Sequence, residues 1–376
     1  MKMRGAYVVK LDLTQPHLAG VADKVRAQAD ALEAVPADID RYHLADGRVV
    51  CNGKPIASAG SGAIARRLAH YVLFHVVLSA RREPLDFVYM RHQGSSPLLL
   101  WTLWRLRRRN PHMMVIAELP SWPYGVPGSL RGKALALLDR LSNRGLRRQV
   151  DRILTFSRAP EIFGIATIMT DNGVDVTRLA VLPAKLATGT FRMLGLANLS
   201  FWHGYDRVIE GIARYFAEGG TADVHFDIVG TGVELPRLHE LVDRHRLHDR
   251  VHFHGAHRGA GLDAIMEASD IGISSIGMHR LDVDTSNLKS REFCARGLPF
   301  VLAYGDRDFP SAFPFVFHAP ADETPLDIGA VLAFTRDLRS RNPQWRTDMR
   351  TYAEERLSWT AKMWPAIEAI RDHWNS

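Results

Sequence analysis

Residues 191–229 show the alternation of strand and helix patterns from which the fold class follows: FRMLGLANLSFWHGYDRVIEGIARYFAEGGTADVHFDIV. This stretch predicts a strand over 191–196, a helix over 205–218 and a second strand over 224–229. A strand, a crossover helix and a further strand form a βαβ unit, whose two strands run parallel. The alternation continues with strands over 251–253, 271–274 and 300–303 and helices over 232–246, 262–269 and 289–296. The sequence therefore predicts an α/β domain with a parallel sheet.

The first half of the chain repeats this alternation. We expect strands over 5–11, 86–90, 113–117 and 152–156, and helices over 19–34, 61–82, 97–109 and 130–149. A hairpin over 48–56 turns at Asn52-Gly53. The prediction is thus two doubly wound domains, with their ligands in a cleft at the carboxyl ends of the strands. The expected order is an N-terminal domain over 1–180, a linker over 181–190, a second domain over 191–355, and a C-terminal helix over 356–376 packing back on the first domain.

The composition excludes several classes of protein. The chain has 376 residues, of which 46% are hydrophobic and 24% charged, unlike collagen-like or disordered chains. Its only cysteines, Cys51 and Cys294, cannot form a disulfide framework or a cysteine zinc site. No segment reaches the ~20 apolar residues of a membrane span, and the N-terminus is charged where a signal peptide is apolar. We expect a cytoplasmic protein.

The positive charge is concentrated in the first half. Residues 1–180 hold 26 Lys and Arg against 15 Asp and Glu, whereas residues 181–376 hold 22 against 26. The basic stretches WRLRRRN at 104–110 and NRGLRRQ at 143–149 are either solvated helix faces or contacts to an anionic leaflet, worth ~1 kcal/mol per basic residue. We expect peripheral contact with the inner face of the membrane. Nucleic acid is not an expected partner, because no recognised helix motif or aromatic-rich sheet is visible.

The strongest functional signal is DTSNLKSREFCARGLP at 284–299. Asp284 and Glu292 are eight residues apart across a loop and a helix start, and Glu292 could accept hydrogen bonds from two adjacent sugar hydroxyls. Free backbone N–H groups at such a helix start favour an anion such as a diphosphate, and Lys289 adds a cation. The N-cap candidates are Thr285, Ser286 and Asn287.

Two further loops follow strands. Gly230 and Gly232, in VGTG, lie between a strand and a helix, where glycine allows a phosphate to approach the backbone. The pair lacks the third glycine of G-x-G-x-x-G, so it is a weak signal alone. His203, in SFWHGYDR, could donate a hydrogen bond to a phosphate, although a solvated loop histidine fits equally well.

These motifs together resemble the nucleotide-sugar domain of the GT-B glycosyltransferases, specifically the large retaining family with a Glu-x7-Glu motif (glycosyltransferase group 1, family 4-like). The resemblance covers most of residues 165–303 and runs through TIMTDNGVDV, WHGYDRVIEGI, FDIVGTG, VHFHGAHRGAGLDAIMEASDIGIS and LKSREFCARGLPFVLA. The first half resembles the more variable acceptor domain less closely, through YMRHQGSSPLLL and ELPSWPYG. The latter is similar to a subgroup of capsular and exopolysaccharide assembly.

The resemblance implies roles for individual residues. Glu292 matches the glutamate that holds the nucleotide ribose, and Asp284, a shorter carboxylate, stands where the family's first glutamate contacts the transferred sugar. The backbone at 285–287 and the loop of Gly230 and Gly232 match the segments beside the diphosphate. We take Asp284, Lys289 and Glu292 as the catalytic set.

This chain also departs from the family pattern. The family commonly grips the diphosphate with an Arg and a Lys after the first strand of this domain, where Asn198 and His203 stand here. We expect Lys289 and Arg291 to supply the missing charge. His257, in VHFHGAH, matches a segment beside the nucleobase.

The remaining expectations concern the acceptor side and metals. Glu118 falls where the family often has a histidine near the donor sugar, and we place Arg91 and Gly20 with it on the acceptor side of the cleft. His252, His254 and His257 would be candidate metal ligands. The family, however, binds its donor without an obligatory divalent ion, which implies no metal and no cofactor.

The resemblance therefore implies a retaining glycosyltransferase of class EC 2.4. It would move a sugar from a UDP- or GDP-sugar to a hydroxyl of a glycan or lipid-linked saccharide, in polysaccharide biosynthesis. The alternative is a catalytically weak GT-B scaffold that only binds a nucleotide sugar, motivated by the departures at Asp284, Asn198 and His203. A GT-B epimerase or phosphorylase is less favoured, because a phosphorylase needs a pyridoxal lysine and the epimerases resemble a different acidic pattern.

Overall fold

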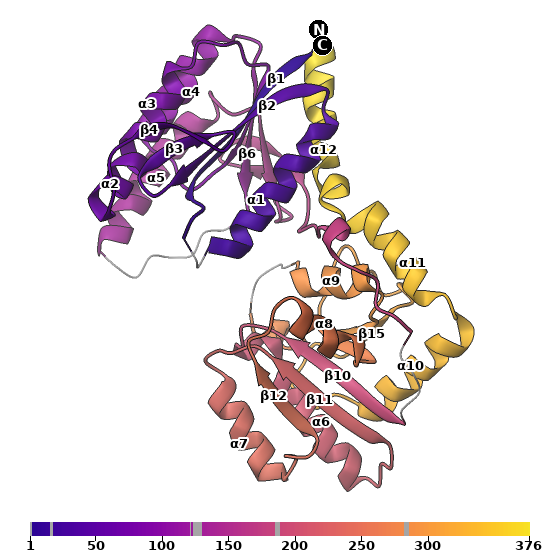
Figure 1. Ribbon diagram of the computed structural model, residues 1–376. Helices are drawn as coiled ribbons and strands as arrows, with labels where there is room; N and C mark the ends of the chain where they lie inside the picture. Colours follow the sequence, from indigo (N-terminus) through magenta and orange to yellow (C-terminus); the bar gives the residue numbers. More distant parts are fainter. Residues whose placement is uncertain (1, 16–17, 121, 123–129, 185–188, 282–285) are drawn as a thin grey trace. The chain divides into compact units, whose positions relative to one another are not determined.

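The computed structural model describes residues 2–15, 18–120, 122, 130–184, 189–281 and 286–376, and the chain forms two units (Figure 1). Unit 1 comprises Met1–Asp171 and Lys362–Ser376, and unit 2 comprises Asn172–Ala361. The boundary lies upstream of the expected linker over 181–190. Leu182 shows why, since its side chain is buried in the core of unit 2 and its N–H donates to the carbonyl of Arg296 at 2.9 Å.

Unit 1 is built on a nine-stranded sheet in the order β4-β3-β2-β1-β5-β6-β7-β9-β8. The strands are β1 (Met3–Asp12), β2 (Ala37–Ala45), β3 (Arg48–Cys51), β4 (Lys54–Ser58), β5 (Phe87–Arg91), β6 (Met114–Leu119), β7 (Arg152–Thr155), β8 (Glu161–Ile162) and β9 (Ile165–Met169). The predicted strands form a parallel core of β1, β5, β6 and β7. The predicted hairpin is β3–β4, with positive φ at Asn52 and Gly53. Strands β2, β8 and β9 were not predicted.

Helices cover both faces of this sheet (Figure 1). On one face, α1 and the C-terminal helix pack over Tyr7 and Tyr89, whose rings stack at 5.3 Å. Gln28 of α1 accepts from the Tyr7 hydroxyl at 3.2 Å, and Met363 of α12 lies 3.9 Å from the Tyr89 hydroxyl. The other face carries α2 to α5. The helical segments are α1 (Ala19–Ala31), η2 (Leu32–Ala34), α2 (Ala63–Leu68), η3 (Ala69–Leu73), α3 (Phe74–Ala80), α4 (Pro97–Arg109), α5 (Leu130–Leu146) and α12 (Trp359–Asn375).

The alternation of side chains along β1 assigns each residue to a face. Val8 is in the core formed with α3 and α4, together with Phe74 and Leu103. Successive strand residues point to opposite faces, so Lys10 lies on the same face as Val8. Lys10 is therefore directed under α3 and α4.

Unit 2 contains a six-stranded parallel sheet in the order β12-β11-β10-β13-β14-β15. The strands are β10 (Thr190–Leu196), β11 (Asp223–Val229), β12 (Val251–Gly255), β13 (Ile271–Ile273), β14 (Phe300–Leu302) and β15 (Val316–His318). The helical segments are η4 (Val176–Arg178), η5 (Phe201–His203), α6 (Tyr205–Ala217), α7 (Leu235–His245), α8 (Ala260–Glu267), η6 (Met278–Arg280), α9 (Leu288–Arg296), α10 (Ile328–Arg341), α11 (Trp345–Tyr352) and η7 (Ala353–Leu357). The prediction of two parallel-sheet α/β domains is confirmed, although β15 and α10 were not predicted.

Candidate donor-binding site

The loops that follow β10 and β13 meet at the carboxyl end of the unit 2 sheet. Gly204 adopts φ +69°, and a Cβ built there would lie 2.6 Å from the backbone nitrogen of Gly277. The N–H of Ile276 donates to the carbonyl of His203 at 3.0 Å. This close backbone contact requires glycine at 204 and holds His203 against the loop that leads to α9.

Helix α9 begins at this point with an open N-terminus. Asn287 precedes it in an extended conformation and makes no side-chain capping bond. Its amide Nδ2 is buried without a hydrogen-bond partner among the described residues. Ser286 is buried and tied to Asn172, which donates from its backbone N–H to Oγ at 3.2 Å and from Nδ2 to the carbonyl at 2.8 Å. Uncapped N–H groups at a helix start attract an anion. Asp284 and Thr285 lie outside the described residues.

Lys289 carries the positive charge of this site. Its ammonium Nζ lies 2.9 Å from Nδ1 of His203 and 3.5 Å from the hydroxyl of Tyr205, on whose ring it also stacks. No carboxylate pairs with it within the described part of the chain. Burial lowers the pKa of Lys289 to about 7. Burial removes water from the ammonium and so disfavours its charged form. An anionic ligand would favour the charged form again, and no carboxylate among the described residues already does so.

His203 supports Lys289 instead of acting as a cation itself. Nε2 lies 3.1 Å from the carbonyl of Asn198 and must donate to it. Nδ1 is therefore an acceptor for Lys289 and for the hydroxyl of Ser275 at 2.9 Å. Burial and the Lys289 charge lower the pKa of His203 to about 3. The expectation that His203 donates to a phosphate is wrong, because both ring nitrogens are occupied within the protein.

The predicted glycine loop has a backbone role. A Cβ at Gly230, which has φ +129°, would lie 1.8 Å from the carbonyl oxygen of Ala197, and one at Gly232 would lie 2.2 Å from that of Leu199. The two glycines therefore allow the loop after β11 to pack directly against the loop after β10. The loop thus lies beside the segment that carries Asn198, whose carbonyl accepts from His203. No contact among the described residues identifies a ligand of the loop.

The charge of Arg291 is already paired with two carboxylates, which argues against its predicted role in donor binding. Its guanidinium is fully buried and bonds to both carboxylate oxygens of Asp306, at 2.5 and 2.6 Å, and to Asp308 at 2.6 Å. Burial alone would lower the pKa of Arg291, but hydrogen bonds and charge from Asp306 raise it overall. The side chain anchors α9 to the loop after β14.

Glu292 lies on the first turns of α9 and is half-buried. Its Oε1 accepts from Nε of Arg296 at 3.0 Å, and Arg296 also pairs with Asp263 at 2.9 Å. These contacts fix the carboxylate while Oε2 makes no hydrogen bond among the described residues. The arrangement is compatible with binding a pair of hydroxyls.

The histidines around β12 are engaged with one another and with Asp227. Nε2 of His252 lies 3.0 Å from Nδ1 of His225, and Nε2 of His254 lies 2.7 Å from Asp227. His257 is exposed, with its ring 6.4 Å from that of His254. No group of three potential metal ligands occurs in the part of the chain that the structure describes.

Glu118 and Arg91 form a buried cluster in unit 1. The Glu118 carboxylate is 0% exposed and accepts from Arg91 at 2.8 Å and from the Tyr89 hydroxyl at 3.0 Å, with Lys24 Nζ at 3.7 Å. The side chain of Glu118 is therefore not exposed to an acceptor, contrary to expectation. Gly20 is exposed near the start of α1, and a Cβ built there would have no atom within 4 Å.

Three contributing residues were missed in the sequence. Ser275 and Tyr205 complete the surroundings of His203 and Lys289. Tyr205 lies within SFWHGYDR but was assigned only to a helix start, and no local motif marks Ser275. Lys10 was detectable, because it is a lysine inside the apolar strand AYVVKLDL at a position that alternation assigns to the core.

Comparisons with known proteins agree on the fold. No protein-family model matches the sequence, and no curated protein matches it either. Among solved structures, HepE of Anabaena in complex with UDP is 14% identical with a TM-score of 0.60, covering 99% of this chain and 100% of that one. The lipopolysaccharide outer core galactosyltransferase WaaB is 14% identical with a TM-score of 0.57, covering 98% and 99%. Sucrose-phosphate synthase of Thermosynechococcus elongatus is 14% identical with a TM-score of 0.59, covering all of both chains. The chain has the GT-B fold.

Proposed function

We propose that the chain is a glycosyltransferase that takes a sugar from a nucleotide-sugar donor. The observation that carries the proposal is the buried ammonium of Lys289, without a carboxylate among the described residues, beside the uncapped N-terminus of α9. The site lies at the carboxyl end of a parallel sheet, where such folds bind nucleotides. HepE, which shares the fold, has been solved with UDP and with UDP-glucose, so a uridine diphosphate sugar is the first donor to test.

The residues suggest how transfer would proceed. The bond between the anomeric carbon and the diphosphate oxygen breaks, and the α9 N–H groups with Lys289 stabilise the charge that develops on the leaving diphosphate. The acceptor hydroxyl bonds to the anomeric carbon on the same face, and its proton passes to the departing phosphate oxygen. This route retains the anomeric configuration. Glu292 would hold the ribose through Oε2.

The same residues support donor binding without a divalent metal. The ammonium of Lys289 and the helix amides already supply the positive charge that a metal ion would bring to the diphosphate. We propose that no cofactor is required. Asp284 keeps in this proposal the role that the resemblance implies, contact with the transferred sugar.

The test is a thermal-shift series with UDP, GDP, ADP and CMP, each with magnesium and with chelator. A ligand at ~100 times its Kd stabilises a protein by ~2.7 kcal/mol. We expect one nucleotide to raise Tm equally in both conditions, and Lys289→Met or Glu292→Gln to abolish the shift. Lys362→Met, on α12, is the control. Absence of any shift would overturn the proposal, and a shift that requires magnesium would overturn its metal-independent part.

Turnover separates the enzyme from the scaffold alternative. Release of the free nucleoside diphosphate from the matching nucleotide sugar, with a glycan extract as acceptor, is expected for the enzyme. Product analysis by NMR then reports whether the anomeric configuration is retained. Binding without release, under conditions that saturate the site, would favour the scaffold.

We further propose that unit 1 binds the surface of an anionic membrane, where a lipid-linked saccharide would be the acceptor in polysaccharide assembly. None of the helices among the described residues has the length and apolar character to span a bilayer. Large apolar side chains are nevertheless exposed on the helices of one face of unit 1, namely Ile64, Leu68, Tyr71, Val72, Val76, Trp101, Trp104, Leu137, Leu138 and Leu141.

Charge on these helices favours an anionic partner. Arg105 stacks on Trp101 at 5.4 Å and Arg108 on Trp104 at 5.0 Å, which places each guanidinium beside an exposed indole. Segments α2, η3, α3 and α4 contain no Asp or Glu. Trp and Arg together suit the interface between lipid headgroups and acyl chains. Arg107 and Arg109 of the basic stretch are instead bound to Asp151 and to backbone carbonyls.

A further inference from the structure

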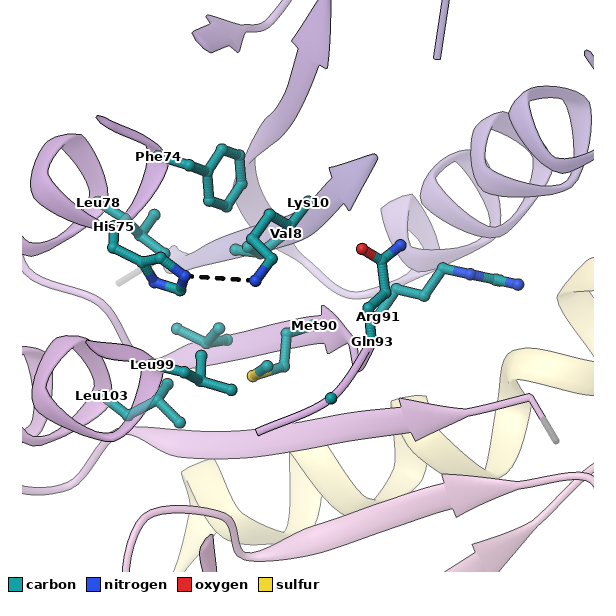
Figure 2. A pocket seen from close by; sticks show the side chains of 12 residues that line it. Val8, Lys10, Phe74, His75, Leu78, Met90, Arg91, Gln93, Leu99 and Leu103 are labelled. Carbon is teal, nitrogen blue, oxygen red and sulfur yellow. Dashed lines mark hydrogen bonds between the residues drawn. The ribbon is translucent and has the colours of Figure 1, made fainter. Parts of the chain in front are cut away.

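A small cavity in unit 1 lies between β1, β5, α3 and α4 (Figure 2). Its volume is about 30 Å³, about twice what a single water requires. Apolar side chains form most of the wall, namely Val8, Phe74, Leu78, Val88, Met90, Leu99 and Leu103. The polar groups are Lys10, His75, Arg91 and Gln93. A cavity of this size accepts a small charged group and not a sugar ring.

Lys10 places a charged amine in this mostly apolar cavity. Figure 2 shows its amine directed toward His75, and Nζ lies 3.4 Å from Nε2 of that ring. The other ring nitrogen, Nδ1, is 3.3 Å from the hydroxyl of Thr102, which itself donates to the carbonyl of Leu98 at 2.7 Å. Because that hydroxyl proton is already used, Nδ1 must donate, and Nε2 is left as an acceptor. His75 therefore holds Lys10 through a neutral ring.

No negative charge balances Lys10 among the described residues. Burial lowers the pKa of Lys10 to about 8, so the amine is still largely protonated at neutral pH. Three histidines, His75, His70 and His92, surround it, and burial lowers the pKa of each ring, to about 3, 4 and 4. The carboxylate of Asp139 lies behind Gly94 of the wall and accepts from the backbone of Ser95 and from Asn143. Arg91, also on the wall, is paired with Glu118.

The nearest acid along β1 is also engaged elsewhere. The carboxylate of Asp12 accepts from the backbone and hydroxyl of Thr14, from Gln15 and from the backbone of Asp46. Lys10 thus keeps two N–H groups without an anionic acceptor while its hydration is restricted. Retaining such a charge lowers stability unless a ligand neutralises it.

We propose that this cavity binds an oxyanion, a phosphate or carboxylate group carried by the acceptor substrate. The proposal rests on the glycosyltransferase function, because it assigns the ligand of unit 1 to the acceptor. The ammonium of Lys10 forms charge-assisted hydrogen bonds to the oxyanion, His75 orients the ammonium, and the apolar wall excludes water around the pair. Lys10 remains partly exposed at the carboxyl end of β1, so a substituent of a larger molecule can reach it.

The test uses the full chain carrying Lys289→Met, which removes the ammonium of the donor site. Inorganic phosphate and acetate are titrated separately at pH 6.5 and constant ionic strength, with Tm as the readout. We expect one of them to raise Tm with saturation. Adding Lys10→Met should weaken that binding by about tenfold or more, the effect of losing one charge-assisted bond. Lys54→Met, at an exposed position on β4, should leave it unchanged.

A second measurement separates a binding lysine from a structural one. Without ligand, Lys10→Met is expected to raise Tm, because it replaces an unbalanced, partly buried charge with an apolar chain of similar length. A lower Tm would show that the amine stabilises the fold and would overturn the proposal. Saturation by phosphate identifies a phosphorylated acceptor group, and saturation by acetate alone identifies a carboxylate.

Failure of this proposal is distinguishable from failure of the proposed function. If neither probe saturates, or if Lys10→Met leaves the response intact, the oxyanion site is rejected. Nucleotide binding by the chain with Lys289 intact is measured independently, and Lys10→Met should not change it. If the chain with Lys289 intact binds no nucleotide, the glycosyltransferase function is rejected. The result on oxyanion binding is then still valid.

Discussion

The ammonium of Lys289 lies 2.9 Å from Nδ1 of His203, and the histidine is held neutral by the bond from its Nε2 to the Asn198 carbonyl. A neutral imidazole can accept from an ammonium, whereas a protonated one would repel it. The pair therefore places one positive charge, on Lys289, at the start of α9. The pKa of Lys289, lowered to about 7 by burial, makes this charge sensitive to a bound anion.

Nucleotide binding should take up protons. A diphosphate beside Lys289 favours the ammonium, so binding of UDP at pH 7 is expected to take up roughly half a proton at this residue. Above pH 7 the affinity should fall as the free protein loses that proton. Calorimetry in buffers of different ionisation enthalpy measures the uptake. An equal uptake by Lys289→Met would contradict this assignment.

Removing the Lys289 charge should stabilise the free protein. The folded-state pKa is lowered, so between pH 7 and the ordinary lysine range the unfolded chain binds more protons and stability rises with pH. At pH 7 and below, Lys289→Met is expected to increase the free energy of unfolding, and the difference should shrink as pH rises. Urea unfolding at pH 6 and pH 9 checks the sign. Lys54→Met should show neither effect.

Arg291→Met should destabilise the protein without specifically weakening nucleotide binding. The change leaves the buried carboxylates of Asp306 and Asp308 without their cation. Loss of one partner from a buried ion pair costs ~3–5 kcal/mol. Urea unfolding measures it, with Arg336→Met at an exposed position on α10 as the control. If Arg291→Met weakened UDP binding as much as Lys289→Met in a folded sample, the anchoring role would be wrong.

Gly230→Ala should destabilise unit 2 more than a positive φ alone explains. The new Cβ would lie 1.8 Å from the carbonyl oxygen of Ala197, so the loops after β10 and β11 must separate. Gly219→Ala is the matched control, because Gly219 also has positive φ, +89°, but open space around it. The free energy of unfolding should fall by about 1–2 kcal/mol in the control. It should fall by clearly more in Gly230→Ala. Equal losses of stability in the two variants would mean that backbone strain from the positive φ explains both, and that the contact between the loops adds nothing.

The exposed tryptophans of α4 should be required for membrane binding. We expect the chain to sediment with vesicles of phosphatidylcholine and phosphatidylglycerol, and less with phosphatidylcholine alone. Trp101→Ser with Trp104→Ser should reduce sedimentation. Trp364→Ser is the control, since Trp364 is 40% exposed on α12, across the sheet. Equal binding to both vesicle types, or an equal loss in the control, would count against an arginine-flanked docking face.

The parallel cores of both sheets were predictable because their strands are short apolar runs, such as VHFDIV and VYM, between amphipathic helices. Strand β2, ADIDRYHLA, was missed because charged residues occupy its partly exposed positions next to a hairpin. Strand β15 was missed because no helix separates it from β14, so the alternation of strand and helix patterns gives no signal there. Helix α10 carried its own signal, an Asp327 N-cap that accepts from Ala330, which the sequence prediction did not use.

The candidate site likewise contains some features that the sequence predicts and others that it does not. The start of α9 and Lys289 were predictable from local spacing, because helix starts have local signatures. The roles of Arg291 and His203 were not, because they depend on partners distant in sequence. Asp306 and Asp308 bind Arg291 from the loop after β14, and Asn198 and Ser275 occupy both nitrogens of His203. Sequence alone shows a charged residue, and the structure shows whether a neighbour has already neutralised it.

The division of the chain between the two units constrains the order of folding during synthesis. Unit 2 is one continuous segment, Asn172–Ala361, whereas unit 1 needs Lys362–Ser376 to cover Tyr7, Gln28 and Tyr89. Residues 362–376 follow unit 2 in the chain and are therefore translated after it, although they complete the domain whose other segments precede unit 2. Until they are released, that domain keeps an open apolar face, and a nascent chain interrupted before Lys362 would be a target for chaperones and proteases.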